Sequence, residues 1–168
     1  MGSSKQTSRK RSAANSTSAS PPEAGPVLFL DRDLGKFDVA EALRAIGATV
    51  RLHADLFPPD AKDPEWLPQV GANGWVVLTR DKHILTRPLE VVALVRANTH
   101  VFILKSRQEL NGAQMASAFV SAYPHMCRLI KSHSPPFLAR VTRTGDVREI
   151  EGYKQLQERL EKFGSQSR

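Results

Sequence analysis

The chain has 168 residues, of which 40% are hydrophobic, so it is long enough for one domain with a sizeable core and short for two. No apolar run reaches the roughly 20 residues of a membrane-spanning helix, and the first residues lack the apolar segment of a secretory signal. The single cysteine, Cys127, excludes an intrachain disulfide and a zinc cluster built from several cysteines. We therefore expect a cytoplasmic protein without membrane association.

The formal charge of +7 is unevenly distributed along the chain. Residues 1–26 carry four bases and one acid, residues 27–100 nine bases and ten acids, and residues 101–150 seven bases and three acids. An acidic region within a basic surround suits an enzyme that acts on a polyanion such as RNA, because basic side chains attract phosphates. A solvated basic surface that binds no partner explains the same charge.

Residues 1–26 consist mainly of Ser, Thr, Ala, Lys and Arg, and Met1 is their only apolar residue larger than alanine. Such a segment cannot bury a core, so we expect a disordered basic tail. Its cluster of Arg9, Lys10 and Arg11 is suited to contact nucleic acid, and a leader that only aids solubility explains the cluster equally well.

From Val27 onward, short apolar runs alternate with amphipathic stretches. This rhythm is typical of an α/β three-layer sandwich with a mostly parallel central sheet, and it predicts one domain over residues 27–163. Right-handed crossovers place the first strand between the second and the third. The predicted strands lie near 27–31, 48–53, 75–79 and 100–104, and the predicted helices cover 37–46, 64–71 and 88–97.

The C-terminal third predicts a long helix, a hairpin and a final helix. Asn111 is suited to cap the long helix, and a hairpin of 137–141 with 147–150 is expected at a sheet edge. A polar helix over 153–163 is followed by a disordered end, 164–168. The buried stripe of the long helix is predicted to consist of Met115, Phe119, Ala122, Met126 and Ile130.

Carboxylates follow two of the predicted strands directly. Asp31 and Asp33 come after the first strand and Asp81 after the third. Because the carboxyl ends of neighbouring parallel strands share one edge, these side chains are expected to converge at the switch point of the sheet. Converging carboxylates repel one another unless they are protonated or bound to a cation, and Mg²⁺ or Mn²⁺ prefers oxygen ligands of this kind.

A third ligand is expected from the loop after the second strand, which contains Asp55, Asp60 and Asp63. We choose Asp63, because it precedes Pro64 at the expected N-cap of the next helix and is thus held at the mouth of the sheet. Helix capping alone explains Asp63 as well. Asp33 either adds a further metal-binding oxygen or serves the turn before Gly35.

Basic side chains flank these acids. Arg80 and Lys82 bracket Asp81, and Lys105 ends the fourth predicted strand. All three are candidates to bind a substrate phosphate, although they also offset the negative charge of the carboxylates. His83 is close in sequence, but a histidine at such a position is usually structural. The sequence contains no HExxH, GxSxG, Walker or GxGxxG motif.

Four segments together resemble the PIN-domain and PIN-like nucleases, in particular the compact group that contains the VapC-type toxins. They are FLDRDLG (29–35), ALRAIGATVRLHAD (42–55), FPPDAKDPEWLPQVGANGWVVLTRDKHI (57–84) and VFIL (101–104). The likeness extends over about 27–141, and its LTRD block is the more specific part.

This resemblance implies an endoribonuclease that depends on Mg²⁺ or Mn²⁺ and leaves 5′-phosphate and 3′-hydroxyl ends. Asp31, Asp63 and Asp81 match the family's catalytic acidic pocket, with Asp33 as a further candidate metal ligand. No residue after the LTRD block clearly matches the family's fourth acid, which leaves the number of metal ions open. The resemblance also implies RNA as substrate, a toxin role with a cognate antitoxin, and a homodimer.

Two other functions remain open. FLDRD also resembles the nucleophile loop of haloacid-dehalogenase-type phosphatases, in which Asp31 would attack phosphate and Asp33 act as acid and base. Asp146 imitates that family's later acidic motif, with Glu149 beyond it. However, Val141–Arg143 alternates like an exposed edge strand and no Gly-Thr follows Asp33. The third possibility is a non-catalytic module that binds RNA or a protein partner and retains a degenerate acidic pocket.

Overall fold

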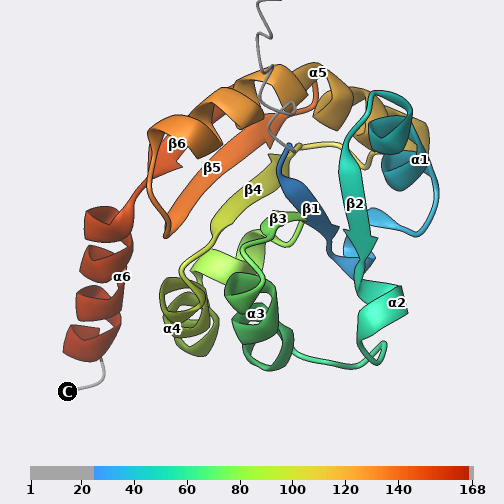
Figure 1. Ribbon diagram of the computed structural model, residues 1–168. Coiled ribbons are helices and arrows are strands. Elements are labelled where there is room, and N and C mark those ends of the chain that lie inside the picture. The colour runs from blue at the N-terminus through green and yellow to red at the C-terminus, as the bar shows by residue number, and fades with distance from the viewer. Residues whose placement is uncertain (1–24, 167–168) are drawn as a thin grey trace, which may run out of the picture.

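The computed structural model describes residues 25–166, so nearly all of the predicted basic tail lies outside the described residues. The chain forms one six-stranded sheet with the order β2-β1-β3-β4-β5-β6, between two layers of helices (Figure 1). All neighbouring strands are parallel except β5 and β6. The strands are β1 (Val27–Leu30), β2 (Thr49–Leu52), β3 (Val76–Thr79), β4 (His100–Lys105), β5 (Phe137–Thr142) and β6 (Val147–Glu151).

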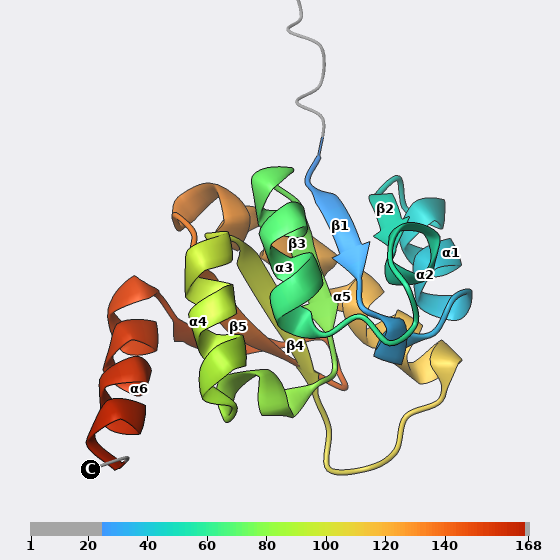
Figure 2. The same ribbon diagram turned by 90° about the horizontal axis from the view of Figure 1, so that it is seen from below.

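Helices cover both faces of the sheet (Figures 1 and 2). One face carries α1 and α5, and the other carries α3 and α4, with α6 packed beside α4. This arrangement confirms the predicted three-layer sandwich. The helices are α1 (Asp38–Ala45), α2 (His53–Leu56), α3 (Asp63–Ala72), α4 (Pro88–Ala97), α5 (Gly112–Ser132) and α6 (Tyr153–Gln166), with the short 3-10 helices η1 (Arg32–Leu34) and η2 (Lys82–Leu85).

Each face of the sheet has its own hydrophobic core, because successive side chains of a strand point to opposite faces. Leu28 and Leu30 of β1 pack with the α1 and α5 side, while Phe29 between them packs against Trp66 of α3. All three β1 side chains are fully buried. Burial on both faces explains why the strands appear in the sequence as continuous apolar runs.

The helices α3 and α4 approach each other closely at Gly71. A Cβ atom built on Gly71 would lie 2.0 Å from the carbonyl oxygen of Ala97, so only glycine allows this approach. The contact matters for the functional site because Asp63 begins α3 and Glu90 lies in the first turn of α4. The relative positions of these two acids are thus fixed by rigid helix packing.

The C-terminal region differs from the prediction in three respects. β5 is an internal strand, parallel to β4, so the interpretation of Val141–Arg143 as part of an exposed edge strand was wrong, whereas the predicted hairpin at a sheet edge is confirmed, with β6 as the edge. Ile130 of the predicted buried stripe is only partly buried. The last helix extends to Gln166, three residues beyond its predicted end at residue 163.

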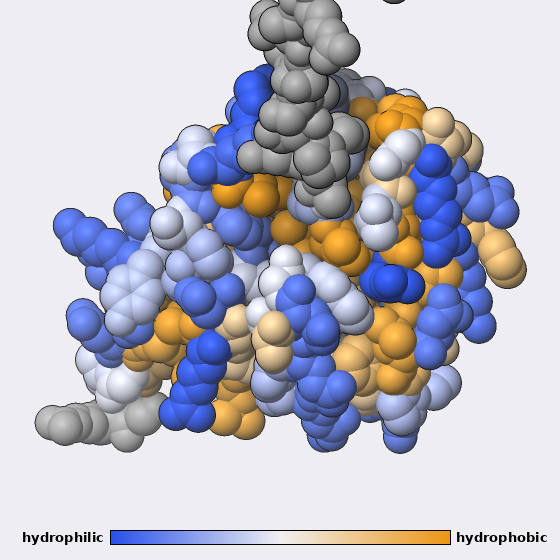
Figure 3. Space-filling view, in the orientation of Figure 1, coloured by the Kyte–Doolittle hydropathy of each residue, from blue (hydrophilic) through white to orange (hydrophobic). Residues whose placement is uncertain are grey.

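Within residues 25–166, no helix is long and apolar enough to cross a membrane. On the face seen in Figure 3, hydrophilic side chains are interspersed with smaller apolar areas. The large apolar side chains that remain exposed come from separate elements, and scattered residues of this kind are normal for a protein surface. They are Phe37, Ile46, Leu56, Leu89, Ile150 and Tyr153.

Candidate functional site

The predicted switch point lies at the carboxyl ends of β1 and β3. The two strands are parallel neighbours, and the backbone N–H of Asp31 extends their pairing by donating to the carbonyl of Leu78 at 2.9 Å. The hydroxyl of Thr79 donates to Asp31 Oδ2 at 2.9 Å and accepts from the N–H of Asp81 at 3.0 Å. The threonine of the LTRD block therefore links the carboxylate of Asp31 to the backbone of Asp81.

These strand ends open into a cavity of about 430 Å³. All four predicted acidic residues line it, together with the basic residues Arg32, Arg80 and Lys82 and with His83. The other two acids of the loop after β2, Asp55 and Asp60, are exposed and do not line this cavity. The four lining aspartates are Asp31, Asp33, Asp63 and Asp81.

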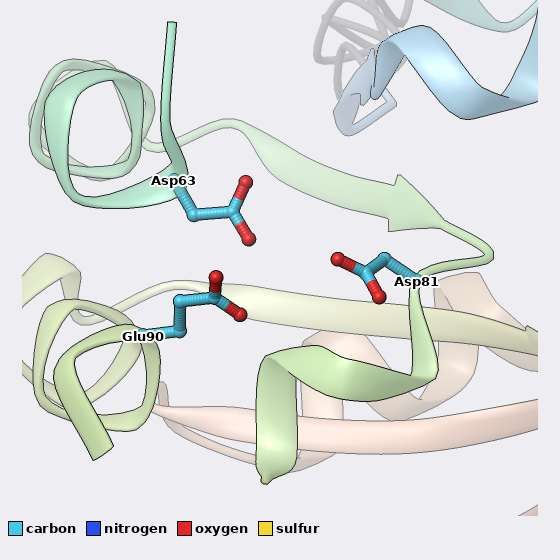
Figure 4. Close-up of side chains that lie close together, drawn as sticks. All are labelled: Asp63, Asp81 and Glu90. Carbon is cyan, nitrogen blue, oxygen red and sulfur yellow. The ribbon is translucent and has the colours of Figure 1, made fainter. Parts of the chain in front are cut away.

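The tightest group of carboxylates includes a residue that the sequence analysis missed. One carboxylate oxygen each from Asp63, Asp81 and Glu90 lies within 4.8 Å of the other two. The three side chains come from the start of α3, the end of β3 and α4, and point toward one another (Figure 4). Glu90 follows the LTRD block in the chain and was not among the predicted ligands.

A positional signal for Glu90 was present in the sequence. A helix that follows a parallel strand begins at the carboxyl edge of the sheet, where ligand sites lie. Glu90 is in the first turn of such a helix, two residues after its opening Pro88. An acid at this place could have been included among the candidate ligands.

Asp63 is not the helix N-cap that the sequence predicted. Lys62 occupies the N-cap position, and Asp63 is the first helical residue. Asp63 is only 6% exposed, and its side chain accepts no hydrogen bond from any residue in the described part of the chain. Helix capping therefore does not account for this carboxylate, which is buried and directed at two other acids.

Glu90 is likewise incompletely paired. Its Oε1 accepts from Arg87 at 2.9 Å, whereas its buried Oε2 has no hydrogen-bond partner among the described residues. Arg87 also lies 4.0 Å from Asp81, so one exposed guanidinium offsets part of the charge of the group. An unpaired buried carboxylate oxygen is costly in the folded protein.

Burial raises the pKa of three carboxyl groups of the cavity, and neighbouring negative charges raise the pKa of two of them further. Burial, and then the charge of Asp31, raises the pKa of Asp33 to about 7. Burial raises the pKa of Asp63 to about 7 as well, with further contributions from Asp31 and Glu90. The pKa of Asp31 is also raised by burial, although hydrogen bonds from Thr79 and the Arg32 N–H oppose the shift. Full ionisation of the cavity is therefore unfavourable without added positive charge.

A divalent cation fits these residues. The available donors are carboxylate oxygens, the type that Mg²⁺ and Mn²⁺ prefer. The unpaired Asp63 side chain and the orphaned Oε2 of Glu90 are both directed into the group, where a cation would satisfy them. Asp63, Asp81 and Glu90 are the nearest set of potential ligands, with Asp31 on the neighbouring strand end.

Arg32 fastens the loop that delivers Asp63. Its Nη1 donates to the carbonyls of Pro59 and Ala61 at 2.5 and 2.7 Å. The two bonds tie the segment before α3 to the residue that directly follows Asp31. Arg32 is therefore a candidate positioning residue for the carboxylate of Asp63, a kind of support that commonly tunes metal affinity.

We expect Arg32→Met to weaken Mn²⁺ binding by about tenfold or more, because loss of an outer partner typically costs metal sites this much. Calorimetric titration with Mn²⁺ measures the effect, and Arg32→Lys should recover part of it. A role of Arg32 as a positive charge alone predicts the reverse, since removing a cation near the site would then strengthen Mn²⁺ binding. Tighter binding by Arg32→Met would thus contradict the positioning role.

The predicted phosphate-binding residues divide between two places. Arg80 and Lys82 line the acidic cavity, whereas Lys105 lines a neighbouring one. Asp33 accepts from the backbone N–H of Arg80 at 3.4 Å, which links it to the strand end that presents these bases. Both Arg80 and Lys82 are thus placed to meet an anion that enters the cavity.

Comparison with known families is consistent with this architecture. Residues 26–106 match the family described as PIN like domain, and this segment contains β1 to β4 together with Asp31, Asp33, Asp63, Asp81 and Glu90. The match assigns the chain to no VapC-type subgroup, and searches of curated proteins and of solved structures found no match. The predicted resemblance to PIN-like proteins is confirmed: the chain contains a PIN-like domain.

Proposed function

We propose that the protein is a metal-dependent endoribonuclease whose active site is the acidic cavity. The observation that carries this proposal is the group of Asp63, Asp81 and Glu90, three converging carboxylates that include a buried oxygen without a partner among the described residues. Such a group lies at the carboxyl edge of a PIN-like domain, a fold typical of nucleases. The surrounding bases suit a substrate that carries phosphates.

The residues present indicate how the site would work. Asp63, Asp81 and Glu90 would hold the cation, and Asp31 would be within the same cavity to complete the set. A bound Mg²⁺ or Mn²⁺ supplies Lewis-acid chemistry, because it acidifies water and stabilises charge that develops on a phosphodiester.

The remaining side chains orient the site and the substrate. The Arg32 N–H and the Thr79 hydroxyl hold the two oxygens of Asp31, at 2.7 and 2.9 Å, and the N–H of His83 holds Asp81 Oδ1 at 2.9 Å, so hydrogen bonds orient both carboxylates. Arg80 and Lys82 would bind the phosphate oxygens of the strand to be cut. The chain thus separates acids for the cation from bases for the substrate.

The phosphatase alternative receives less support from the geometry. Asp146, the residue that imitated its later acidic motif, accepts hydrogen bonds from Thr142 and Thr144 within its own hairpin and does not line the acidic cavity. A phosphatase would need that acid beside Asp31. Because β5 is internal, an exposed edge strand before Asp146 no longer argues against a phosphatase. The position of Asp146 outside the acidic cavity is the observation that favours the nuclease over the phosphatase.

A comparison of substrates tests the proposal. We expect the protein with Mn²⁺ to cut internally labelled single-stranded RNA into internal fragments, to stop when EDTA is added, and to leave small phosphomonoesters intact. Electrophoresis of the RNA and a phosphate-release assay give the two readouts. Monoester turnover without RNA cleavage would support the phosphatase, and RNA binding without either reaction would support the non-catalytic module.

The narrower implications of the VapC-type resemblance stay predictions. These are a toxin role, a cognate antitoxin and a homodimer, together with a cytoplasmic location. The substrate comparison addresses the chemistry that all of them presuppose.

A further inference from the structure

A second cavity, of about 670 Å³, adjoins the acidic one. The two cavities share Arg80, Lys82, His83, Leu104 and Ser106, so they are continuous at the end of β3 and β4. The second cavity has no Asp or Glu among its lining residues. We call it the basic groove, after its basic residues Arg80, Lys82, Lys105, Arg107, Arg140 and Arg159.

Three of the six basic residues of the groove lie beyond the family match. The match ends at residue 106, whereas Arg107 follows β4, Arg140 lies on β5 and Arg159 on α6. In the sheet, β4 and β5 lie on the side of β3 that is away from β1. The basic groove therefore combines residues of the matched segment with residues of this chain's own C-terminal region.

Two arginines of the basic groove form ion pairs with glutamates of β6. The guanidinium of Arg159 forms two hydrogen bonds with Glu151, at 2.9 and 2.5 Å. The side chain of Arg140, only 18% exposed, lies 3.0 Å from Glu149 and 3.7 Å from Glu151. Neither glutamate lines the groove, so both acids orient the arginines and leave the lining basic.

The other cations are available to a ligand. Lys82 and Arg107 have no acidic partner within residues 25–166. Lys105 pairs with Glu149 at 3.2 Å, but both side chains are more than half exposed. Exposed pairs of this kind contribute little, so a phosphate can replace Glu149 at Lys105 at small cost.

We propose that the basic groove binds the phosphates of a single RNA strand on one side of the bond that is cut. The proposal rests on the ribonuclease function above, because the groove opens into the acidic cavity through Arg80 and Lys82. Arg140 and Arg159 are donors that glutamates hold in place, and Lys105 and Arg107 are exposed donors. Apolar side chains of Leu85, Ile103 and Leu104 complete the lining and suit the less polar parts of a nucleotide.

Salt-dependent binding tests the groove without relying on cleavage. The full chain is titrated onto a labelled single-stranded RNA of about 12 nucleotides in EDTA, and fluorescence anisotropy is followed across a salt series. The variant Lys105→Met with Arg107→Met removes two proposed phosphate contacts. Its matched control, Arg96→Met with Arg128→Met, removes two exposed positive charges on α4 and α5 that line neither cavity.

We expect the groove variant to bind about tenfold more weakly, with a salt slope smaller by about 1.4, since each contact to a single strand contributes about 0.7. The control should keep the wild-type slope. Unchanged RNA binding by the groove variant, or an equal loss of RNA affinity in the control, would contradict the proposal that the groove binds RNA. Melting temperatures of both variants verify folding, and Lys105→Glu with Arg107→Glu should weaken binding further.

Cleavage assays keep this test separate from the proposed function. If the protein binds RNA through the groove but does not cut it, the proposal for the groove stands and the proposed ribonuclease function fails. If the protein cuts RNA but the groove variant binds RNA with wild-type affinity and salt slope, the ribonuclease function stands and the proposal for the groove fails.

Discussion

Asp81→Asn is expected to lower RNA cleavage by about 1,000-fold or more, because a catalytic cation contributes several kcal/mol and each 1.36 kcal/mol is tenfold in rate. The fold should persist. Asp81 Oδ1 accepts from the N–H of His83 at the start of η2, and an asparagine oxygen can accept the same bond. The loss therefore falls on the carboxylate oxygen that faces Asp63 and Glu90. Initial rates in saturating Mn²⁺ measure it.

Asp31→Asn should show a comparable loss, because Asp31 lines the same cavity at the end of the adjacent strand. The matched control is Asp55→Asn, which removes an exposed carboxylate of α2 outside that cavity. Control activity should equal that of the wild type. Full activity in both Asp31→Asn and Asp81→Asn would contradict the assignment of cleavage to this site.

The second large effect concerns stability. The pKa of Asp63 is about 7 in the folded protein, well above its ordinary value of 3.8, so the folded state binds a proton more strongly than the unfolded one. The favourable contribution of the protonated group is complete below the ordinary pKa and is lost as pH rises through about 7. In metal-free protein at pH 8, the charged Asp63 is therefore destabilising.

Asp63→Asn removes this titration with nearly the same shape. In EDTA at about pH 8 we expect the substitution to raise stability by about 2–4 kcal/mol, or several degrees in melting temperature, and at about pH 5 to raise it by a smaller amount. Mn²⁺ at about 1,000 times its Kd should reverse the order, because it then stabilises the wild type by about 4.1 kcal/mol. Melting curves at both pH values give the result.

The comparison of variants is needed because other groups titrate in the same range. Burial lowers the pKa of His53 and His100, so their contribution to stability rises with pH and opposes that of Asp63. This opposing contribution is common to wild type and Asp63→Asn and cancels in their difference. If the wild type is as stable as Asp63→Asn at pH 8 in EDTA, the charged Asp63 carboxylate does not destabilise the folded protein.

The parts of the site on strand ends could be predicted from the sequence. Asp31 and Asp81 directly follow buried parallel strands, and the order of the strands places their ends side by side. The apolar runs are strong signals because both faces of the sheet are covered. Asp63 was also placed correctly at the start of α3, although one position away from its actual role in the helix.

Other parts depend on tertiary packing that the chain's local pattern does not encode. Glu90 reaches Asp63 because α3 and α4 pack closely at Gly71, a contact between distant segments. The tether from Arg32 to the carbonyls of Pro59 and Ala61 depends on the conformation of an irregular loop. β5 was mistaken for an exposed strand because its sequence alternates near its end, while its pairing with β4 is set by the fold.

The central claim, that the acidic cavity is a divalent metal centre, is tested most directly by anomalous diffraction from crystals soaked in Mn²⁺. The proposal predicts a peak between Asp63, Asp81 and Glu90, with their carboxylate oxygens as ligands at about 2.0–2.2 Å. Occupancy should fall in crystals of Asp81→Asn soaked in the same way. A cavity without a peak at saturating Mn²⁺, or a peak that persists unchanged in Asp81→Asn, would contradict the metal centre.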